Sequence, residues 1–142
     1  MKTWKIGWKV GYVADDYEWI EAENKREARK LCKAANAGSE AEIVSIEERV
    51  NTDILFEEAF DRLVELFKPM KHLEIDDCRG AESWFVIPVF YVWMNGNRPE
   101  SEQLDAFRFS RKSYESEAEM VKRFHEELDE FITGRNWKKL DK

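Results

Sequence analysis

The segment HLEIDDC, residues 72–78, holds the densest group of reactive side chains in this 142-residue sequence. Carboxylates grouped in this way bind divalent metals, and a nuclease would need two or three of them to converge on one ion. The same segment has the composition of a turn, where Asp bonds to the backbone, and no Lys-bearing strand follows at a nuclease-like spacing. We therefore expect no metal or catalytic centre from its five candidates, which are His72, Glu74, Asp76, Asp77 and Cys78.

Other catalytic patterns are absent from the sequence. No Ser lies in a nucleophile-elbow pattern, and no Gly-rich phosphate loop joins a strand to a helix. His125 flanks the apolar stripe of a predicted helix, which is typical of a boundary residue. Cys32 and Cys78 have neither ligand spacing nor redox spacing, and whether they pair is left open. We expect a non-enzymatic protein that needs no cofactor or metal.

The charge of the chain limits its partners. The net charge is -7 and the pI is near 5.0, which argues against a direct electrostatic grip on nucleic-acid phosphates. The first strand mixes Trp with Lys, as a base-stacking platform would. Strand alternation, however, puts Trp4 and Trp8 on one face and Lys5 and Lys9 on the other. We therefore favour a basic protein partner and keep a nucleic-acid-binding module as an alternative.

An acidic stripe runs along the segment DILFEEAFDRLVELF, residues 53–67. Four of its carboxylates fall four residues apart, which on a helix spaces them roughly 6 Å apart, as phosphates are spaced along a nucleic-acid strand. Each like-charge pair at this spacing costs a few tenths of a kcal/mol in an isolated helix. The stripe is either a solvated face or a contact surface for a basic partner. The candidate partner-binding residues are Asp53, Glu57, Glu58, Asp61 and Glu65.

Two local ion pairs are expected beside this stripe. Glu58 and Arg62 are four residues apart on the same predicted helix, and Arg49 lies four residues before Asp53. Residues 38–67 hold two basic and nine acidic side chains, so the whole net charge of the chain comes from one predicted strand and one predicted helix.

Hydrophobic periodicity predicts three main helices and five or six strands. The expected order is ββα-βα-ββα, with a short strand before the last hairpin. Runs of adjacent hairpins favour an antiparallel sheet, so we expect one α+β domain over residues 1–142, with four to six strands and the helices packed on the sheet. The expected strands are 3–13, 17–22, 41–50, 72–75, 84–94 and 104–112, and the expected helices are 24–38, 52–67 and 116–134.

Helix ends and core residues follow from the same patterns. Asn24 with Glu27, and Ser116 with Glu119, have the spacing of capping boxes, and Gly38 and Gly134 stand where helices usually end. Ala28, Leu31, Cys32 and Ala35 form the predicted buried stripe of the first helix. Residues expected to be largely buried are Trp4, Trp8, Leu31, Phe60, Leu63, Phe85, Val89, Phe124 and Leu128.

The sequence contains no run of 18 apolar residues, and MKTWKIGWKV lacks the apolar core of a signal peptide. We expect no membrane-spanning segment and a cytoplasmic location with reduced cysteines.

The stretch YEWIEAENKREARKLCKAA, residues 17–35, resembles the opening of many small phage and prophage accessory proteins. These are acidic, single-domain proteins without enzymatic motifs, and anti-CRISPR inhibitors are among them. The resemblance implies a protein that binds and blocks another protein, in the host cytoplasm if it is phage-encoded. The expected function is therefore an inhibitor whose acidic helix face docks on a basic groove of a nucleic-acid-handling protein. The alternative is a phage structural or assembly protein that self-associates through its aromatic-rich strands.

Overall fold

The computed structural model describes residues 1–10, 16–38, 41–78, 88–94, 103–112 and 115–141. Helices and antiparallel sheets are both present, which confirms the α+β class. The six described strands form two three-stranded sheets, whereas the sequence predicted one sheet. The elements are β1 (Lys2–Val10), β2 (Asp16–Ala22), α1 (Lys25–Ala35), β3 (Ala41–Glu48), α2 (Thr52–Phe67), β4 (Leu73–Asp77), β5 (Pro88–Met94), β6 (Gln103–Arg108), α3 (Glu117–Thr133) and α4 (Trp137–Leu140).

Contacts group the chain into two compact units, each with its own sheet. The first unit is Met1–Val50 with Arg111–Val121, and the second is Asn51–Ser110 with Lys122–Lys142. The single-domain prediction concerns the chain as a whole and stays a prediction.

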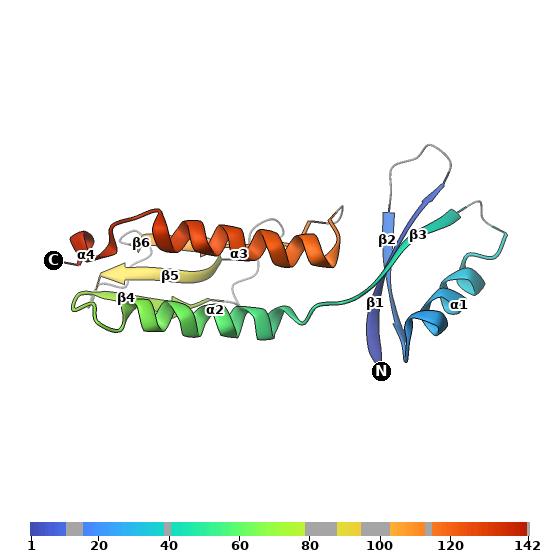
Figure 1. Ribbon diagram of the computed structural model, residues 1–142, viewed down its shortest axis with the longest axis horizontal. Coiled ribbons are helices and arrows are strands. Elements are labelled where there is room, and N and C mark those ends of the chain that lie inside the picture. Colours follow the sequence, from blue (N-terminus) through green and yellow to red (C-terminus); the bar gives the residue numbers. More distant parts are fainter. Residues whose placement is uncertain (11–15, 39–40, 79–87, 95–102, 113–114, 142) are drawn as a thin grey trace. The chain divides into compact units, whose positions relative to one another are not determined.

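The first unit is an antiparallel sheet in the order β2-β1-β3, with α1 packed against one face (Figure 1). The alternation of β1 turns Trp4 and Ile6 toward the helix, as the sequence predicted. The core between helix and sheet is small, because α1 contributes only Ala28 and Cys32 to it. Its buried residues are Trp4, Ile6, Ala22, Ala28, Cys32 and Ile46.

A β-bulge changes which residues of β3 face this core. The register between β1 and β3 shifts between Gly7 and Trp8, so that Val44 has no opposite residue. Ile43 and Ile46 both pack on the core, whereas Val44, which regular strand alternation would put on the same side as Ile46, is exposed. A Cβ at Gly7 would lie 2.4 Å from Ser45 Oγ, so a larger residue at this position would require the Ser45 hydroxyl to rotate away.

The second unit is an antiparallel sheet in the order β4-β5-β6, with α2 and α3 running alongside it (Figure 1). Aromatic rings fill its core. Phe90 of β5 stacks on Phe60 of α2 and on Phe107 of β6, with centroid distances of 5.5 and 6.1 Å. Phe124 of α3 meets Phe107 edge-on at 5.7 Å. These offset and edge-to-face contacts are the preferred aromatic geometries.

The two predicted N-terminal caps are confirmed, and α3 ends at Thr133, next to the predicted Gly134, whereas α1 ends at Ala35 with Asn36 as its C-cap, before the predicted Gly38. Glu27 N–H donates to Asn24 Oδ1 at 2.9 Å, and Ser116 and Glu119 exchange both bonds of a capping box. Gly38, just beyond α1, has a φ of 84°, a left-handed conformation that favours glycine. The short helix α4 was not predicted, although its buried Trp137 contacts Phe67 and Phe131.

The core prediction is confirmed for five residues and wrong for one. Leu31 is 43% exposed, because α1 turns only the row of Ala28 and Cys32 to the core. Ala35, also predicted in that stripe, is exposed. Trp8 and Phe60 are partly buried, and Phe85 lies outside the described residues. The confirmed residues are Trp4, Leu63, Val89, Phe124 and Leu128.

Candidate functional site

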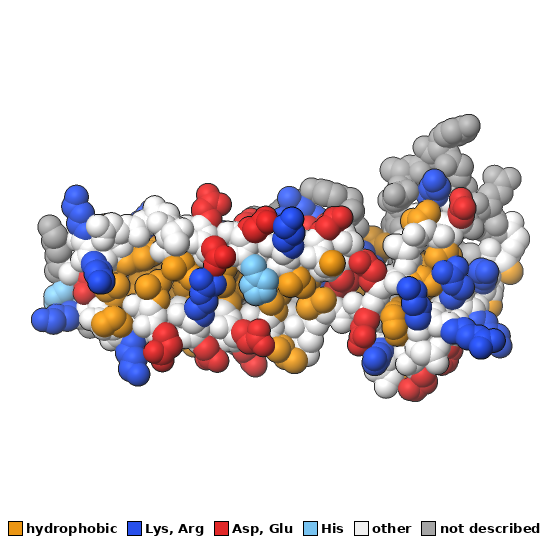
Figure 2. Space-filling model, in the orientation of Figure 1, with side chains coloured by type: hydrophobic (Ala, Val, Ile, Leu, Met, Phe, Trp, Pro, Cys, Tyr) orange, Lys and Arg blue, Asp and Glu red, His pale blue; other side chains and the backbone are white. Residues whose placement is uncertain are grey.

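The outer face of α2 carries all five carboxylates that the sequence singled out. The structure brings them together, and each is exposed. Figure 2 shows acidic side chains gathered along the length of α2. The residues are Asp53, Glu57, Glu58, Asp61 and Glu65, which are called the acidic face below.

Packing of the opposite side fixes the direction of this face. Leu55, Ala59, Leu63 and Phe67 are buried at a spacing of four residues, so one side of α2 is held against the second unit. The helix begins at an N-cap, where Asn51 Oδ1 accepts the N–H groups of Asp53 and Ile54 at 3.1 and 3.4 Å.

The pairing of charges beside the acidic face differs from the prediction. Arg62 reaches across to α3, where its Nη1 lies 2.7 Å from Asp129 Oδ1. Within the described part of the chain, Glu57, Glu58, Asp61 and Glu65 form no ion pair. Four exposed carboxylates on one helix therefore have no ion pair to offset their mutual repulsion.

Two large apolar side chains interrupt the acidic face. Ile54 is 53% exposed and Val64 is 38% exposed. Ile54 lies one turn before Glu57 and Glu58, and Val64 lies one turn after Asp61, so both are bordered by carboxylates.

A second charged face, on α1, was missed by the sequence analysis. Lys25, Arg26, Arg29, Lys30 and Lys33 are all exposed and have no ion pair with any residue that the structure describes. Figure 2 shows basic side chains grouped over α1. They are called the basic face below. Arg26, Arg29, Lys30 and Lys33 follow Lys25 by one, four, five and eight residues, and this regular spacing is visible in the sequence. A count of charges over a longer segment hides it, because that count includes the carboxylates of β2 and of the turn after β2.

The face of the β2-β1-β3 sheet opposite α1 combines aromatic rings with cations. Lys5 Nζ lies 4.8 Å from the ring centre of Tyr17 and 5.8 Å from that of Trp19, and it donates to the Glu115 carbonyl. The Arg49 guanidinium lies 4.8 Å from the ring centre of Trp19. Lys5 is buried, so its charge is used inside the unit through cation–π and hydrogen-bond contacts. This face is not a free stacking platform for bases.

A buried ion pair closes the same face. Arg111 and Glu117 form a salt bridge, and Glu117 is 4% exposed. Arg111 Nη2 donates to the Val50 carbonyl at 3.0 Å, and Glu117 Oε2 accepts the Val50 N–H at 2.8 Å. Both charged groups are thereby satisfied by each other and by the backbone, which is the arrangement of a structural contact rather than of a reactive one.

The residues of HLEIDDC do not assemble a metal site in the described ranges. Five of them form β4 (Leu73–Asp77), which confirms the short strand, and no three His, Cys, Asp or Glu side chains there or elsewhere in those ranges could hold an ion. Burial and the neighbouring charges of Asp76 and Asp77 raise the pKa of Cys78. Both cysteines are free thiols.

The thiol of Cys32 is the most strongly perturbed group. Burial raises its pKa to about 11, and Glu18 adds to the rise because Cys32 Sγ donates to Glu18 Oε1 at 2.9 Å. A thiol in this state is a poor nucleophile at neutral pH.

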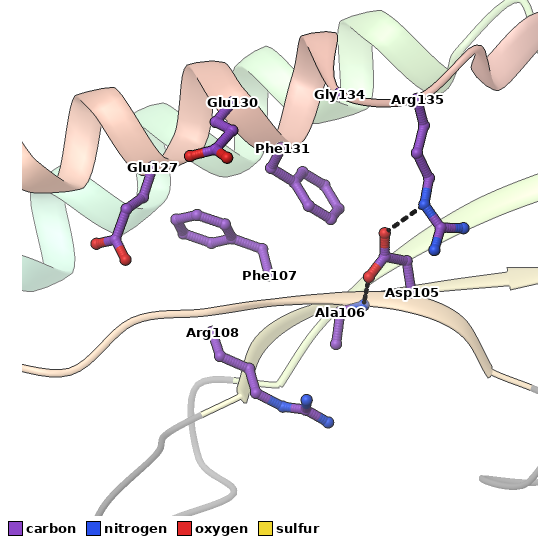
Figure 3. A pocket seen from close by; sticks show the side chains of 9 residues that line it. All are labelled: Asp105, Ala106, Phe107, Arg108, Glu127, Glu130, Phe131, Gly134 and Arg135. Carbon is purple, nitrogen blue, oxygen red and sulfur yellow. Dashed lines mark hydrogen bonds and ion pairs between the residues drawn. The ribbon is translucent and has the colours of Figure 1, made fainter.

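An open cavity of about 470 Å³ lies between β6 and the end of α3 (Figure 3). Its charged groups are largely committed to neighbours. Arg135 Nε lies 3.0 Å from Asp105 Oδ2, and Glu127 Oε2 accepts from Arg123 at 2.8 Å. No nucleophile stands beside a base among the residues that line it.

No family model, no curated protein and no solved structure matches this chain. Among the described residues, no helix combines the length and apolar character needed to cross a membrane.

Proposed function

We propose that this protein is a non-enzymatic binding protein that uses the acidic face of α2 to occupy a basic groove on another protein. The observation that carries the proposal is the run of unpaired carboxylates at Glu57, Glu58, Asp61 and Glu65 around the exposed side chain of Ile54. Repulsion within this run lowers the stability of the isolated chain, and a basic partner would relieve it.

The partner class follows from the geometry of the charges. Residues four apart on a helix repeat every 6 Å or so, which is comparable with the distance between phosphates in a nucleic-acid strand. A groove that binds nucleic acid presents cations at a similar repeat. The proposed partner is therefore a nucleic-acid-handling protein, and the resemblance of residues 17–35 to small phage proteins favours an inhibitor, with CRISPR effectors as one target class.

The apolar residues give this surface its specificity. Charge alone would steer the protein to many basic surfaces and would be weakened by salt. Ile54 and Val64 add a contact that only a groove with matching apolar positions would accept. The proposal is therefore a mixed interface, with charge setting the association rate and the apolar pair limiting dissociation.

The alternative, self-association through aromatic strands, has less support. Tyr17 and Trp19, the partly buried aromatics of β2, are engaged by Lys5 and Arg49 within the same chain. An aromatic interface would have to displace these cations first.

The test compares two triple variants of equal net charge. E57Q/D61N/E65Q neutralises three of the five carboxylates of the acidic face, and E21Q/E42Q/E126Q neutralises three exposed carboxylates elsewhere. Each immobilised protein is incubated with host lysate, and bound proteins are quantified by mass spectrometry at low and high salt, with and without a nucleic-acid competitor. We expect wild type and the control variant to retain basic nucleic-acid-binding proteins at low salt. We expect this retention to be lost in the acidic-face variant, and also in wild type at high salt or with competitor.

Equal retention by the wild type and the acidic-face variant would overturn the proposal and leave α2 with a solvated outer face. Retention that is insensitive to salt and grows with protein concentration would instead favour self-association. An Ile54→Ala variant separates the two contributions, because it should speed dissociation while leaving the salt dependence of association unchanged.

A further inference from the structure

We propose that the basic face of α1 is a binding site for single-stranded nucleic acid, with its phosphates along the helix and one base in the cavity at the helix end. This inference does not rest on the function proposed for α2. It starts from five exposed cations, Lys25, Arg26, Arg29, Lys30 and Lys33, none of which pairs with a described residue. Within α1 only Glu27 is acidic, and its Oε2 accepts the Glu23 N–H.

The cations form two parallel rows. Lys25, Arg29 and Lys33 are four residues apart, and so are Arg26 and Lys30, which gives a rise of about 6 Å between neighbours in each row. This repeat suits successive phosphates of an extended strand. A flexible single strand can follow a row only two turns long, and Arg adds planar donors that match phosphate oxygens.

The cavity at the end of α1 adds a contact that does not depend on charge. Lys33 belongs both to the cation row and to the lining of a cavity of about 260 Å³, which is also lined by Trp8, Asn36 and Ile43. Its volume is several times the roughly 30 Å³ that a water molecule takes in the liquid. It is below the roughly 300–1,000 Å³ of pockets for drug-sized ligands. A single planar base suits this size, and Trp8 offers an aromatic surface of the kind on which unpaired bases stack.

The net charge of the whole chain does not oppose this site. Electrostatic contacts act over a Debye length of about 8 Å at physiological salt, so the local sign on α1 matters more than the total. Within α1 five cations stand against one carboxylate, Glu27, so the local charge is positive although the whole chain has a net charge of -7. A base-sized cavity next to the cations favours nucleic acid over an acidic protein, because a row of carboxylates brings no planar ring.

The direct test measures binding of a fluorescein-labelled 12-nucleotide single strand by anisotropy between 50 and 200 mM salt. A single strand gives a slope of log K against log salt of about -0.7 per phosphate contact, so five contacts predict about -3.5 and a loss of roughly 100-fold over this range. In K25Q/R29Q/K33Q, two cations remain, and the slope should fall to about -1.4.

The matched control is K68Q/K138Q/K139Q, which removes three exposed lysines of the second unit and gives the same net charge. It should bind like wild type. The acidic-face variant E57Q/D61N/E65Q should also bind the strand undiminished, so failure of this site and failure of the proposed function can be told apart. Circular dichroism shows whether each variant is folded.

Three further probes test the base. An abasic strand of the same length keeps the phosphates and should bind at least about fivefold more weakly, since stacking of a base on an aromatic side chain is worth 1–3 kcal/mol. A duplex of the same length should not outcompete the single strand, and a mononucleotide should bind far more weakly than the strand.

Equal loss of binding in the α1 variant and the control would overturn the proposal, as would wild-type binding with no salt dependence. If the abasic strand binds as well as the normal one, the cavity has no role and the proposal fails in that part. Sedimentation of wild type at low salt tests the remaining possibility, which is that a second copy of this chain occupies the basic face. Self-association that disappears in both the α1 variant and the α2 variant would assign the basic face to the acidic face of a second copy.

Discussion

Arg135 and Asp105 together take the place of a neighbouring strand at the edge of the second sheet. Arg135 Nε lies 3.0 Å from Asp105 Oδ2, and Arg135 Nη1 donates to the Leu104 carbonyl at 3.4 Å. The other oxygen of Asp105 accepts the Ala106 N–H at 2.8 Å. Among the described strands, β6 lies at the edge of its sheet, and this one ion pair satisfies a donor and an acceptor of its backbone. Figure 3 shows the pair at the side of the open cavity. Capping of this kind protects an edge from pairing with another chain.

Removing the cap should affect association more than stability. The Arg135→Gln variant should lose about 1 kcal/mol or less, because the ion pair is partly exposed. Amide exchange at Ala106 should become faster, and the variant should aggregate faster on mild heating. Hydrogen exchange and light scattering measure these effects. The Lys122→Gln variant, which breaks an exposed pair within α3, serves as the control, and equal aggregation of both variants would contradict the role of the cap.

Loss of Glu117 should be costly. In the Glu117→Ala variant, Arg111 loses its partner and the Val50 N–H loses its acceptor in a nearly buried setting. We expect a loss of about 2–4 kcal/mol in the free energy of unfolding, below the largest values for buried pairs because Arg111 is partly exposed. Urea denaturation measures it. The Glu119→Ala variant removes only a cap and should cost about 1 kcal/mol. Similar losses in both variants would show that the pair contributes little.

The reactivity of Cys32 should depend on pH in a shifted window. Its folded pKa is raised to about 11 from an ordinary value of 9.0. The neutral thiol is favoured in the folded state, so its stabilising contribution is complete below pH 9 and is lost as the pH rises toward 11. Iodoacetamide should alkylate Cys32 slowly at pH 8, and the rate should rise over the range 9–11. The urea-denatured chain should react with a midpoint near 9. Mass spectrometry of the Cys78→Ser variant isolates the signal, and a folded-state midpoint near 9 would contradict the shift.

Neutralising part of the acidic face should stabilise the protein slightly. The E57Q/D61N/E65Q variant removes three like-charge contacts at four-residue spacing, which are Asp53 with Glu57, Glu57 with Asp61 and Asp61 with Glu65, each worth a few tenths of a kcal/mol. We expect a gain of about 1 kcal/mol at low salt that shrinks in 1 M salt, where the Debye length is about 3 Å. Thermal denaturation at the two salt concentrations measures it. A loss of stability at low salt would mean that these carboxylates have stabilising contacts.

Leu31 and Leu63 provide a contrast between an exposed and a buried leucine. The Leu31→Ala variant should change stability by less than about 1 kcal/mol, because the side chain is half exposed in the first unit. The Leu63→Ala variant should cost about 2–5 kcal/mol, because it leaves a cavity in the second unit. A large loss on Leu31→Ala would mean that the side chain is buried in solution.

Local signals in the sequence predicted the elements well. The α2 range, both capping boxes and the strand around residues 72–75 are set by neighbours along the chain, which a reader of the sequence can see. Burial of Leu31 and Val44 could not be predicted in this way. The exposure of Leu31 depends on which side α1 turns to the sheet, and that of Val44 on a bulge in the pairing of β3 with β1, a strand distant in sequence.

The candidate surfaces also divide into features that the sequence predicts and features that it does not. The acidic face was predictable because its residues lie on one helix and no basic residue interrupts their row. The basic face has an equally regular spacing, but counting charges over a longer segment concealed it. The burial of Lys5 was beyond prediction, because its partner, the Glu115 carbonyl, lies 110 residues away in sequence.

The contribution of Arg111–Val121 to the first unit sets an order of events during synthesis. Residues 1–50 leave the ribosome before the Glu115 carbonyl, which accepts a hydrogen bond from Lys5. They also leave it before Arg111 and Glu117, whose side chains bind the backbone C=O and N–H of Val50. All of Asn51–Ser110 must be translated before these partners arrive, which takes several seconds at roughly 5–20 residues per second. In that interval the aromatic face of the first sheet is open to chaperones and proteases. A nonsense mutation after Ser110 would therefore damage the amino-terminal unit, although every codon of its sheet is intact.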